Sequence, residues 1–506
     1  MRKYYFLKVM TVAVMAFVPF AAGAQQPATS TTGPIPIISV TKSVKSFIEK
    51  QVGQRQSRMK VASSSAFNGR TLYGSLLSSS EWANTSIAEV PYGIYSFEMG
   101  DAPSPKAHLT HLYYSFMSGA NCRDKFYGIT AISAMGVFNG SRHITLDTKR
   151  WKEIYSQVHS TDEGAYSLLA SVMAYNPIDN QIYAFQYNDD LSGQYWSRYN
   201  KETNALEKIA LFRGQYNVLT LASDPSGVLY FINDSGDLYS INKVTGRATL
   251  KGNTGISPTR YTQAMTYDGK TGTFLWASQT AEGSILYSVD PATAETTEVL
   301  KFQNDEQFSS LYSEDNEAVS NAPASVKDLK LTYDGDGALT GNITFTVPTT
   351  TYGGSSFSSG TLNLWVDGVN QKGVEAKAGD KITMPVSLTD GNHYIAANME
   401  NENGFSPLAS VYQYAGYDTP VNVSKVTFTY DKTLGKNTVT WAQPDSGVNS
   451  GYIDKANLRY RIVRMPDSVT VASNYVSTKY VESVPNAMHN YSYRVFIGIH
   501  VQINAL

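Results

Sequence analysis

Short apolar or aromatic runs alternate with Gly, Asn and Asp turns through much of this chain, from about Leu72 to Ser313. Such short runs, rich in Tyr, Thr and Val, favour β-strands over helices. One earlier stretch, residues 41–52, has helical spacing instead, because four apolar residues fall on one face: Val44, Phe47, Ile48 and Val52. The pattern therefore predicts an all-β protein with one short helix before its first strand.

A four-strand unit recurs in this region. Its clearest copies begin at Met173, Leu221 and Met265, which lie 48 and 44 residues apart. Weaker copies begin near Gly93 and Phe126. A repeat of about 40–50 residues with four strands is typical of a β-propeller blade, and blades pack on one another because one sheet cannot cover both of its own faces. We expect about five or six blades.

The copies share a sequence motif, here called the shared phrase, at the third strand and the turn after it. Residues 238–246 read LYSINKVTG, and residues 285–293 read ILYSVDPAT. This phrase resembles the blades of the generic β-propellers found in secreted bacterial proteins. The resemblance implies a propeller-like domain at residues 72–315. The Gly-His and Trp-Asp pairs of WD40 propellers and the Asp boxes of sialidases are absent from the sequence.

Two further β units follow residues 316–325, an acidic and then Pro- and Ala-rich segment that is typical of a linker. The first unit, residues 326–416, contains the strand-like runs ITFTV at 343–347 and LNLWV at 362–366. It ends in an Asn-x-x-Gly-x-Ser-Pro turn that starts at Asn401. The unit resembles an Ig-like or fibronectin-like sandwich, in which such a turn lies between the last two strands.

The second unit, residues 417–506, resembles a fibronectin type III domain. The resemblance implies that Trp441 fills the core between two sheets and that Tyr491 forms the tyrosine corner. It also implies that strand C carries three more of its residues: Tyr460, Ile462 and Arg464. Little sequence remains after Val495 for a seventh strand. We therefore expect an incomplete domain, either because this chain is a truncated version of a longer protein or because the last strand is shortened.

The first residues have the three parts of a secretory signal peptide. Arg2 and Lys3 precede an apolar run at residues 9–22, which ends in an Ala-Gly-Ala cleavage site. The run is too short to span a bilayer comfortably, and no later apolar run has spanning length. We expect residues 1–24 to be removed and residues 25–71 to form a leader that contains the short helix. The mature chain, without a transmembrane segment, would be secreted or held at the cell surface.

Composition and short motifs limit which partners the chain is expected to bind and which reactions it is expected to catalyse. The 41 basic and 43 acidic residues give a net charge of −2 without any basic run, which argues against nucleic acid as a partner. The single cysteine, Cys122, has no partner for an intrachain disulfide, and we expect it to be a buried structural residue. No nucleophile elbow, phosphate loop, dinucleotide fingerprint or His-Glu-x-x-His motif occurs. These absences predict that the chain is not an enzyme and holds no cofactor.

Two short clusters could suggest metal binding. His108 and His111 stand three residues apart, a spacing that does not place them on one face of a strand, and no Cys or acidic ligand set sits beside them. Residues 334–337, Asp-Gly-Asp-Gly, lack the closing Glu of a calcium-binding EF-hand loop. A turn between two strands is the better interpretation of that segment. We predict no metal site.

Aromatic side chains are the remaining candidate ligand-binding groups, because they suit contacts with sugars or proteins at a propeller mouth. The alternative for each is packing between blades or across strands. The candidates are Tyr195, Trp196, Tyr199, Tyr216, Tyr261 and Trp276.

The sequence thus predicts a non-catalytic extracellular or cell-surface binding or scaffold protein of bacterial type, with an adhesive or carbohydrate-binding role. Its ligand would be an extracellular glycan or protein, and the sandwich modules would act as spacers. One rival is the accessory region of a secreted hydrolase or protease whose catalytic part is absent from this chain. Others are a polysaccharide hydrolase with scattered carboxylates on its propeller, or a structural envelope protein without a soluble ligand.

Overall fold

The computed structural model describes most of the chain after residue 66. The described residues are 67, 69–86, 89–100, 103–134, 137–160, 166–189, 191–214, 216–313, 318–371, 373–483 and 490–499. The predicted signal peptide and the predicted helix at residues 41–52 lie outside them. The expectation of an all-β protein is confirmed for the described part, where helical structure is limited to single 3-10 turns: η3 (Ser80–Trp82), η5 (Leu112–Tyr114), η6 (Tyr166–Leu168) and η7 (Lys455–Asn457).

The chain divides into two compact units. The first contains the residues up to Ser325 together with residues 350–360 and 398–408. The second contains residues 326–349, 361–397 and the chain from Ala409 onward. Within the described part, no helix is long and apolar enough to cross a membrane.

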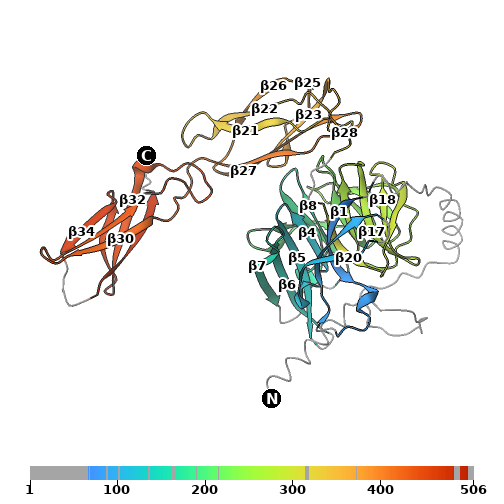
Figure 1. Cartoon of the computed structure of the whole chain (residues 1–506), viewed down its shortest axis with the longest axis horizontal. Helices are drawn as coiled ribbons and strands as arrows, with labels where there is room; N and C mark the ends of the chain where they lie inside the picture. Colours follow the sequence, from blue (N-terminus) through green and yellow to red (C-terminus); the bar gives the residue numbers. More distant parts are fainter. Residues whose placement is uncertain are drawn as a thin grey trace, which may run out of the picture. The chain divides into compact units, whose positions relative to one another are not determined.

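Five antiparallel four-stranded sheets make up the first unit (Figure 1). The first sheet contains β20 (Gln307–Tyr312), β1 (Arg70–Ser78), β2 (Gly93–Met99) and β3 (Lys106–Thr110). The second contains β4 (Ser118–Cys122), β5 (Lys125–Ala134), β6 (Val137–Asp147) and β7 (Lys152–Ser160). The third contains β8 (Ala170–Asn176), β9 (Gln181–Tyr187), β10 (Gln194–Asn200) and β11 (Ala205–Phe212).

The remaining two sheets follow the same strand order. The fourth contains β12 (Val218–Ser223), β13 (Leu229–Asn233), β14 (Asp237–Ile241) and β15 (Ala248–Asn253). The fifth contains β16 (Ala264–Asp268), β17 (Thr273–Thr280), β18 (Gly283–Val289) and β19 (Thr296–Lys301). The strands β4, β8, β12, β16 and β20 each approach the corresponding strand of the next sheet, so they surround a common axis.

The five sheets close into a ring, because a buried apolar cluster lies between each sheet and the next. Representative pairs from the five interfaces are Ile94 with Phe126, Ile129 with Met173, Phe185 with Phe231, Ile232 with Trp276, and Leu275 with Phe97. The first sheet is itself closed by the two ends of the unit, since β20 pairs with β1. Each apolar sheet face is therefore covered by a neighbour, and the predicted β-propeller is confirmed.

The shared phrase of the repeat has a physical origin in the turn between the third and fourth strands. In four sheets, one Asn or Asp side-chain oxygen accepts hydrogen bonds from the backbone N–H groups two and three residues further on. These acceptors are Asp147, Asn200, Asn242 and Asp290. Such Asx turns reverse the chain and thereby fix where the outermost strand of each sheet begins.

Two further sheets follow the five propeller sheets along the chain. One contains β21 (Lys327–Tyr333), β22 (Thr340–Thr346) and β26 (Lys381–Ser387). The other contains β24 (Val369–Asn370), β23 (Ser359–Val366), β27 (Gly391–Asn401) and β28 (Gly404–Phe405), with β25 (Val374–Lys377) paired to β23 and β29 (Ala409–Ala415) paired to β27. The Asp-Gly-Asp-Gly segment forms part of the turn between β21 and β22, as its sequence indicates.

Two three-stranded sheets complete the second unit. They are β30 (Ser424–Asp431), β31 (Lys436–Ala442) and β34 (Lys479–Ser483), and β33 (Val469–Tyr475), β32 (Leu458–Met465) and β35 (Ser492–Ile499). Trp441 and Tyr460 pack edge to face in the core between them, with ring centroids 5.1 Å apart. Tyr491 lies over the Arg464 guanidinium, 5.5 Å from the ring centroid. The Tyr493 hydroxyl reaches the neighbouring strands, where it accepts from Asn437 at 2.7 Å and donates to Glu482.

Candidate functional site

The strand order defines two ends of the propeller. The innermost strands of the five sheets all begin at the same end of the propeller, since each sheet is antiparallel and has the same strand order. The loops that connect the outermost strand of one sheet to the innermost strand of the next therefore lie at that end. We call this end the entrance face. The connections between the second and third strands lie at the same end. Three of the predicted aromatic residues come to it: Tyr195 near the start of β10, and Tyr216 and Tyr261 on entering loops.

The loop at residues 254–263, between β15 and β16, is anchored at both ends. The backbone N–H and the hydroxyl of Thr259 both donate to the Gln279 carbonyl oxygen, at 2.8 and 3.1 Å. At the other end, the Gln263 backbone N–H donates to the carbonyl oxygen of Leu219 at 3.1 Å. These bonds connect the loop to the second strand of its own sheet and to the innermost strand of the sheet before it.

A buried glutamine amide links this loop to the core. Gln263, only 1% exposed, donates through Nε2 to the Arg260 carbonyl oxygen at 2.7 Å. Its Oε1 accepts from the indole N–H of Trp276 at 2.9 Å. Trp276 is fully buried, so it supports the loop from below instead of contacting a ligand.

A residue of the first sheet, Gln307 in β20, holds the Arg260 side chain in place. Its Nη1 donates to Oε1 of Gln307 at 3.1 Å, and Nε2 of Gln307 donates to the Thr262 carbonyl oxygen at 2.7 Å. Gln307 is 1% exposed, whereas Arg260 is half-buried. Among the described residues, the partner of this guanidinium is a neutral amide and not a carboxylate. Its positive charge and its remaining N–H groups are therefore available at the entrance face.

Tyr261 follows Arg260 and is 52% exposed. It lies near enough to Tyr187, at the end of β9, for the two phenols to interact electrostatically. Burial raises the pKa of Tyr187 to about 12, and the Tyr261 hydroxyl adds to the rise, while a hydrogen bond with Ser171 opposes it. The Tyr187 phenol is thus protonated at neutral pH and can donate a hydrogen bond.

The other two predicted residues at this end are more sheltered. Tyr216 is half-buried and stacks on Tyr239, with ring centroids 5.0 Å apart. Tyr195 is also half-buried, and the Lys208 ammonium lies 4.2 Å from its ring centroid. Since β10 is the third strand of its sheet, Tyr195 lies further from the axis than the loop that carries Tyr261.

Three of the six aromatic candidates are core residues. Trp196, Tyr199 and Trp276 are each 0% exposed and belong to apolar clusters between successive sheets. The Trp196 indole N–H donates to the Lys243 carbonyl oxygen at 3.0 Å. Their complete burial separates these three rings from the molecular surface.

One carboxyl group is buried beside this site. Glu306, adjacent to Gln307, is 1% exposed and accepts a hydrogen bond from the Asn304 backbone N–H at 2.9 Å. Burial raises the pKa of this carboxyl, and its hydrogen bonds with Asn304 oppose the rise. Sequence reasoning missed Glu306, Gln307, Gln263 and Arg260, because no local motif marks residues that meet only through pairing of distant strands.

The remaining sequence candidates have structural roles. His108 shares a hydrogen bond of 2.7 Å with the Ser96 hydroxyl and stacks on Trp151. His111 accepts from the Tyr113 backbone N–H at 3.1 Å and caps η5. Cys122 is buried, as expected. Across the described ranges, no three His, Cys, Asp or Glu residues are grouped so that they could hold a metal ion.

Comparison with known proteins finds likeness of fold only. No protein-family model matches the chain, and no curated protein matches it. Among solved structures, it is similar to TolB from Acinetobacter baumannii, with 11% identity, a TM-score of 0.31, and coverage of 67% of this chain and 66% of TolB, just under two thirds. The chain spans about half of two extracellular domains from Bacteroides thetaiotaomicron, 49% of one and 48% of the other.

Two of the similar structures are enzymes. An exo-β-1,3-galactanase from Phanerochaete chrysosporium is 10% identical, with a TM-score of 0.32 and coverage of 65% of this chain and 91% of that one. A gluconolactonase from Xanthomonas campestris is 10% identical, with a TM-score of 0.28 and coverage of 56% and 85%.

The prediction that the chain is not an enzyme is corrected by this finding. Structures of similar fold include the gluconolactonase and a protein described as a candidate 6-phosphogluconolactonase from Bacteroides uniformis. Catalytic groups meet in space and not in sequence, so the absence of a short motif carries no weight against catalysis.

Proposed function

We propose that this chain is an exported carbohydrate-binding protein whose propeller holds its ligand at the entrance face. The observation that carries the proposal is the Arg260–Tyr261 pair, in which the exposed Tyr261 follows a half-buried Arg260 that is held from beneath by buried amides. Export is supported by the signal-peptide pattern of residues 1–24.

The chemistry of the pair suits a sugar. Tyr261 offers a rigid aromatic face with a polar tip, and aromatic groups of this kind contribute most to binding when their conformation is already fixed. Arg260 adds N–H donors in a planar fork, which can bond to ring or hydroxyl oxygens. The support from Gln263 and Gln307 lowers the entropy that binding would otherwise cost, because the loop is ordered before the ligand arrives.

We further propose that the propeller occupies residues 72–315 with five blades, supported by the five sheets and the five apolar clusters between them. The segments 326–416 and 417–506, joined to it by residues 316–325, would be an Ig-like and a fibronectin type III sandwich. Their pairs of sheets and the buried Trp441–Tyr460 contact support this assignment. The two sandwiches would act as spacers.

The proposal is tested by incubating the mature chain, residues 25–506, with an array of glycans and proteins. We expect binding to glycans, and at least a tenfold loss of affinity in Tyr261→Ala, about 1.4 kcal/mol. Tyr430→Ala, which removes an exposed ring from β30, is the matched control and should bind as the wild type does. Hits confined to proteins, or equal affinity of Tyr261→Ala and wild type, would overturn the proposal. Turnover of a bound glycan would identify the entrance face as an active site.

A further inference from the structure

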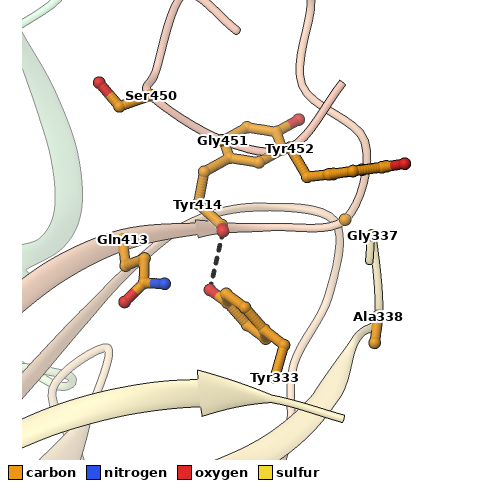
Figure 2. A pocket seen from close by; sticks show the side chains of 9 residues that line it. Tyr333, Gly337, Ala338, Gln413, Tyr414, Ser450, Gly451 and Tyr452 are labelled. Atoms are coloured by element: carbon orange, nitrogen blue, oxygen red, sulfur yellow. Dashed lines mark hydrogen bonds between the residues drawn. The ribbon is translucent and has the colours of Figure 1, made fainter. Parts of the chain in front are cut away.

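A hollow lies in the second compact unit. It has a volume of about 180 Å³. The lining residues are Tyr333, Gly337, Ala338, Gln413, Tyr414, Gly416, Ser450, Gly451 and Tyr452. We call it the tyrosine pocket. Figure 2 shows the rings of Tyr414 and Tyr452 on one side of it and Tyr333 with Gln413 on the other.

The walls of this pocket are fixed by hydrogen bonds. The Tyr333 hydroxyl at the end of β21 donates to the Tyr414 carbonyl oxygen at 2.7 Å (Figure 2). The buried carboxylate of Asp418 accepts from the backbone N–H groups of Asn449 and Gly451, at 2.7 and 3.0 Å, and from the Asn449 side-chain amide at 2.9 Å. The loop that supplies Ser450, Gly451 and Tyr452 is thus held in place by a charge-assisted network.

Two glycines are required by the space around the pocket. Gly416 has φ +89°, and a Cβ there would come within 2.4 Å of Oδ1 of Asp390. A Cβ on Gly451 would come within 2.8 Å of the Tyr414 ring and 2.9 Å of the Asp418 Cβ. A larger residue at Gly451 would displace the Tyr414 ring, and one at Gly416 would meet the Asp390 side chain and require a strained positive φ.

The pocket combines aromatic walls with unused polar groups. Within the described residues, the Gln413 amide, the Ser450 hydroxyl and the Tyr452 hydroxyl have no hydrogen-bond partner, and Tyr452 is 39% exposed. Ligand sites typically combine apolar or aromatic walls with a few polar groups. In Figure 2 the Gln413 amide nitrogen points toward Tyr333, whereas the hydroxyls of Ser450 and Tyr452 point outward. The Gln413 amide is neutral, so the pocket offers hydrogen bonds to hydroxyl oxygens without a counter-charge for an ion.

The volume of the pocket and the charges around it limit which ligands it can hold. A volume of about 180 Å³ is below the roughly 300–1,000 Å³ of sites for drug-sized molecules, and it corresponds to on the order of six waters. The carboxylates of Asp390 and Asp418 approach Gly416 and Gly451 from behind the wall, which disfavours an anion. We propose that the tyrosine pocket is a second binding site, for one uncharged sugar unit such as the terminal residue of a glycan.

This site depends on its own residues and not on the entrance face. The two sites can therefore be tested by separate variants.

The test uses saturation-transfer NMR on the mature chain with neutral hexoses and with glucuronate at matched concentrations. We expect transfer to at least one neutral hexose, affinity in the millimolar range, and at least a fivefold weaker signal in Tyr452→Ala. Gln413→Ala, which leaves the aromatic walls intact, should also weaken the signal, whereas Tyr430→Ala should not. Thermal unfolding of each variant confirms that the fold is retained.

The two proposals fail in different ways. A signal that persists in Tyr261→Ala and is lost in Tyr452→Ala supports the tyrosine pocket. A signal lost in Tyr261→Ala and kept in Tyr452→Ala overturns the pocket and leaves the entrance face standing. Absence of transfer to every neutral hexose, or a preference for glucuronate, overturns the pocket as an uncharged-sugar site.

Discussion

Trp276 and Tyr261 have different roles at the same loop: Trp276 supports the loop from the core, and Tyr261 is exposed on its surface. The Trp276 ring is completely buried and is linked to the loop through the Gln263 amide, while the Tyr261 ring is half exposed. In sequence both are aromatic residues close to turns. Sequence alone does not separate them, because strands in a propeller are covered on both faces. In β17, six consecutive residues from Phe274 to Gln279 are buried, so no alternation of polar and apolar positions shows which way a side chain points.

His143 offers a prediction at the same scale. This residue of β6 is 2% exposed, with Nδ1 2.7 Å from the Asn204 carbonyl oxygen and Nε2 3.3 Å from that of Leu168. Burial, with a smaller contribution from the neighbouring His159, lowers the pKa of His143 to about 4 against the opposing effect of the two carbonyl groups. The folded state thus keeps the ring neutral, whereas the unfolded state protonates near pH 6.5.

Stability should therefore fall as the pH drops from about 6.5 towards 4, since only the unfolded chain gains the proton. Between about pH 7.5 and pH 5 we expect this residue to cost about 2 kcal/mol of unfolding free energy. Urea unfolding of wild type and His143→Gln at the two pH values measures it, and the variant should lose correspondingly less stability. Equal pH dependence in both proteins would show that His143 does not resist protonation.

At the scale of elements, turns that depend on one residue can be predicted from sequence, whereas pairing between strands far apart in the chain cannot. The Asx turns after the third strands follow from single Asn or Asp residues, and the repeat was visible because of them. The pairing of β1 with β20 was not visible, because partners such as Ser75 and Ser310 lie 235 residues apart. The network around Gln307 was missed for the same reason, since Gln307 belongs to β20 and the loop it holds precedes β16.

The ion pair between β1 and β16 provides a prediction for this closure. Nη1 of Arg70 donates to Oδ2 of Asp268 at 2.8 Å, and Nη2 pairs with Oδ1. The Asp268 side chain is 0% exposed and that of Arg70 is 10% exposed. Arg70→Ala leaves a buried carboxylate without its counter-ion, which should lower the unfolding free energy by about 3–5 kcal/mol.

Denaturant unfolding provides the measurement, with Lys455→Ala as the control. Lys455 pairs with Asp445 at 2.9 Å on the surface, where both side chains are largely exposed, so its loss should cost less than about 1 kcal/mol. If Arg70→Ala is no more destabilising than Lys455→Ala, the pair does not hold the first and fifth sheets together.

At the scale of the whole molecule, the sequence was sufficient for the propeller and insufficient for its chemistry. A repeated four-strand unit must bury both sheet faces, and this requirement leads to a ring of sheets whatever their details. Function depends instead on which side chains the ring brings to its ends. Arg260, Tyr261 and Gln307 come from two sheets and meet only when the ring closes, so they carry no mark in the linear sequence.

Hydrogen–deuterium exchange of the mature chain, with and without a glycan that it binds, tests the central claim most directly. We predict slower amide exchange in residues 254–263 when the glycan is bound, because the ligand covers Arg260 and Tyr261, and unchanged exchange in β30. Protection confined to the second compact unit, or no protection of residues 254–263 at saturating glycan, would contradict a binding site at the entrance face.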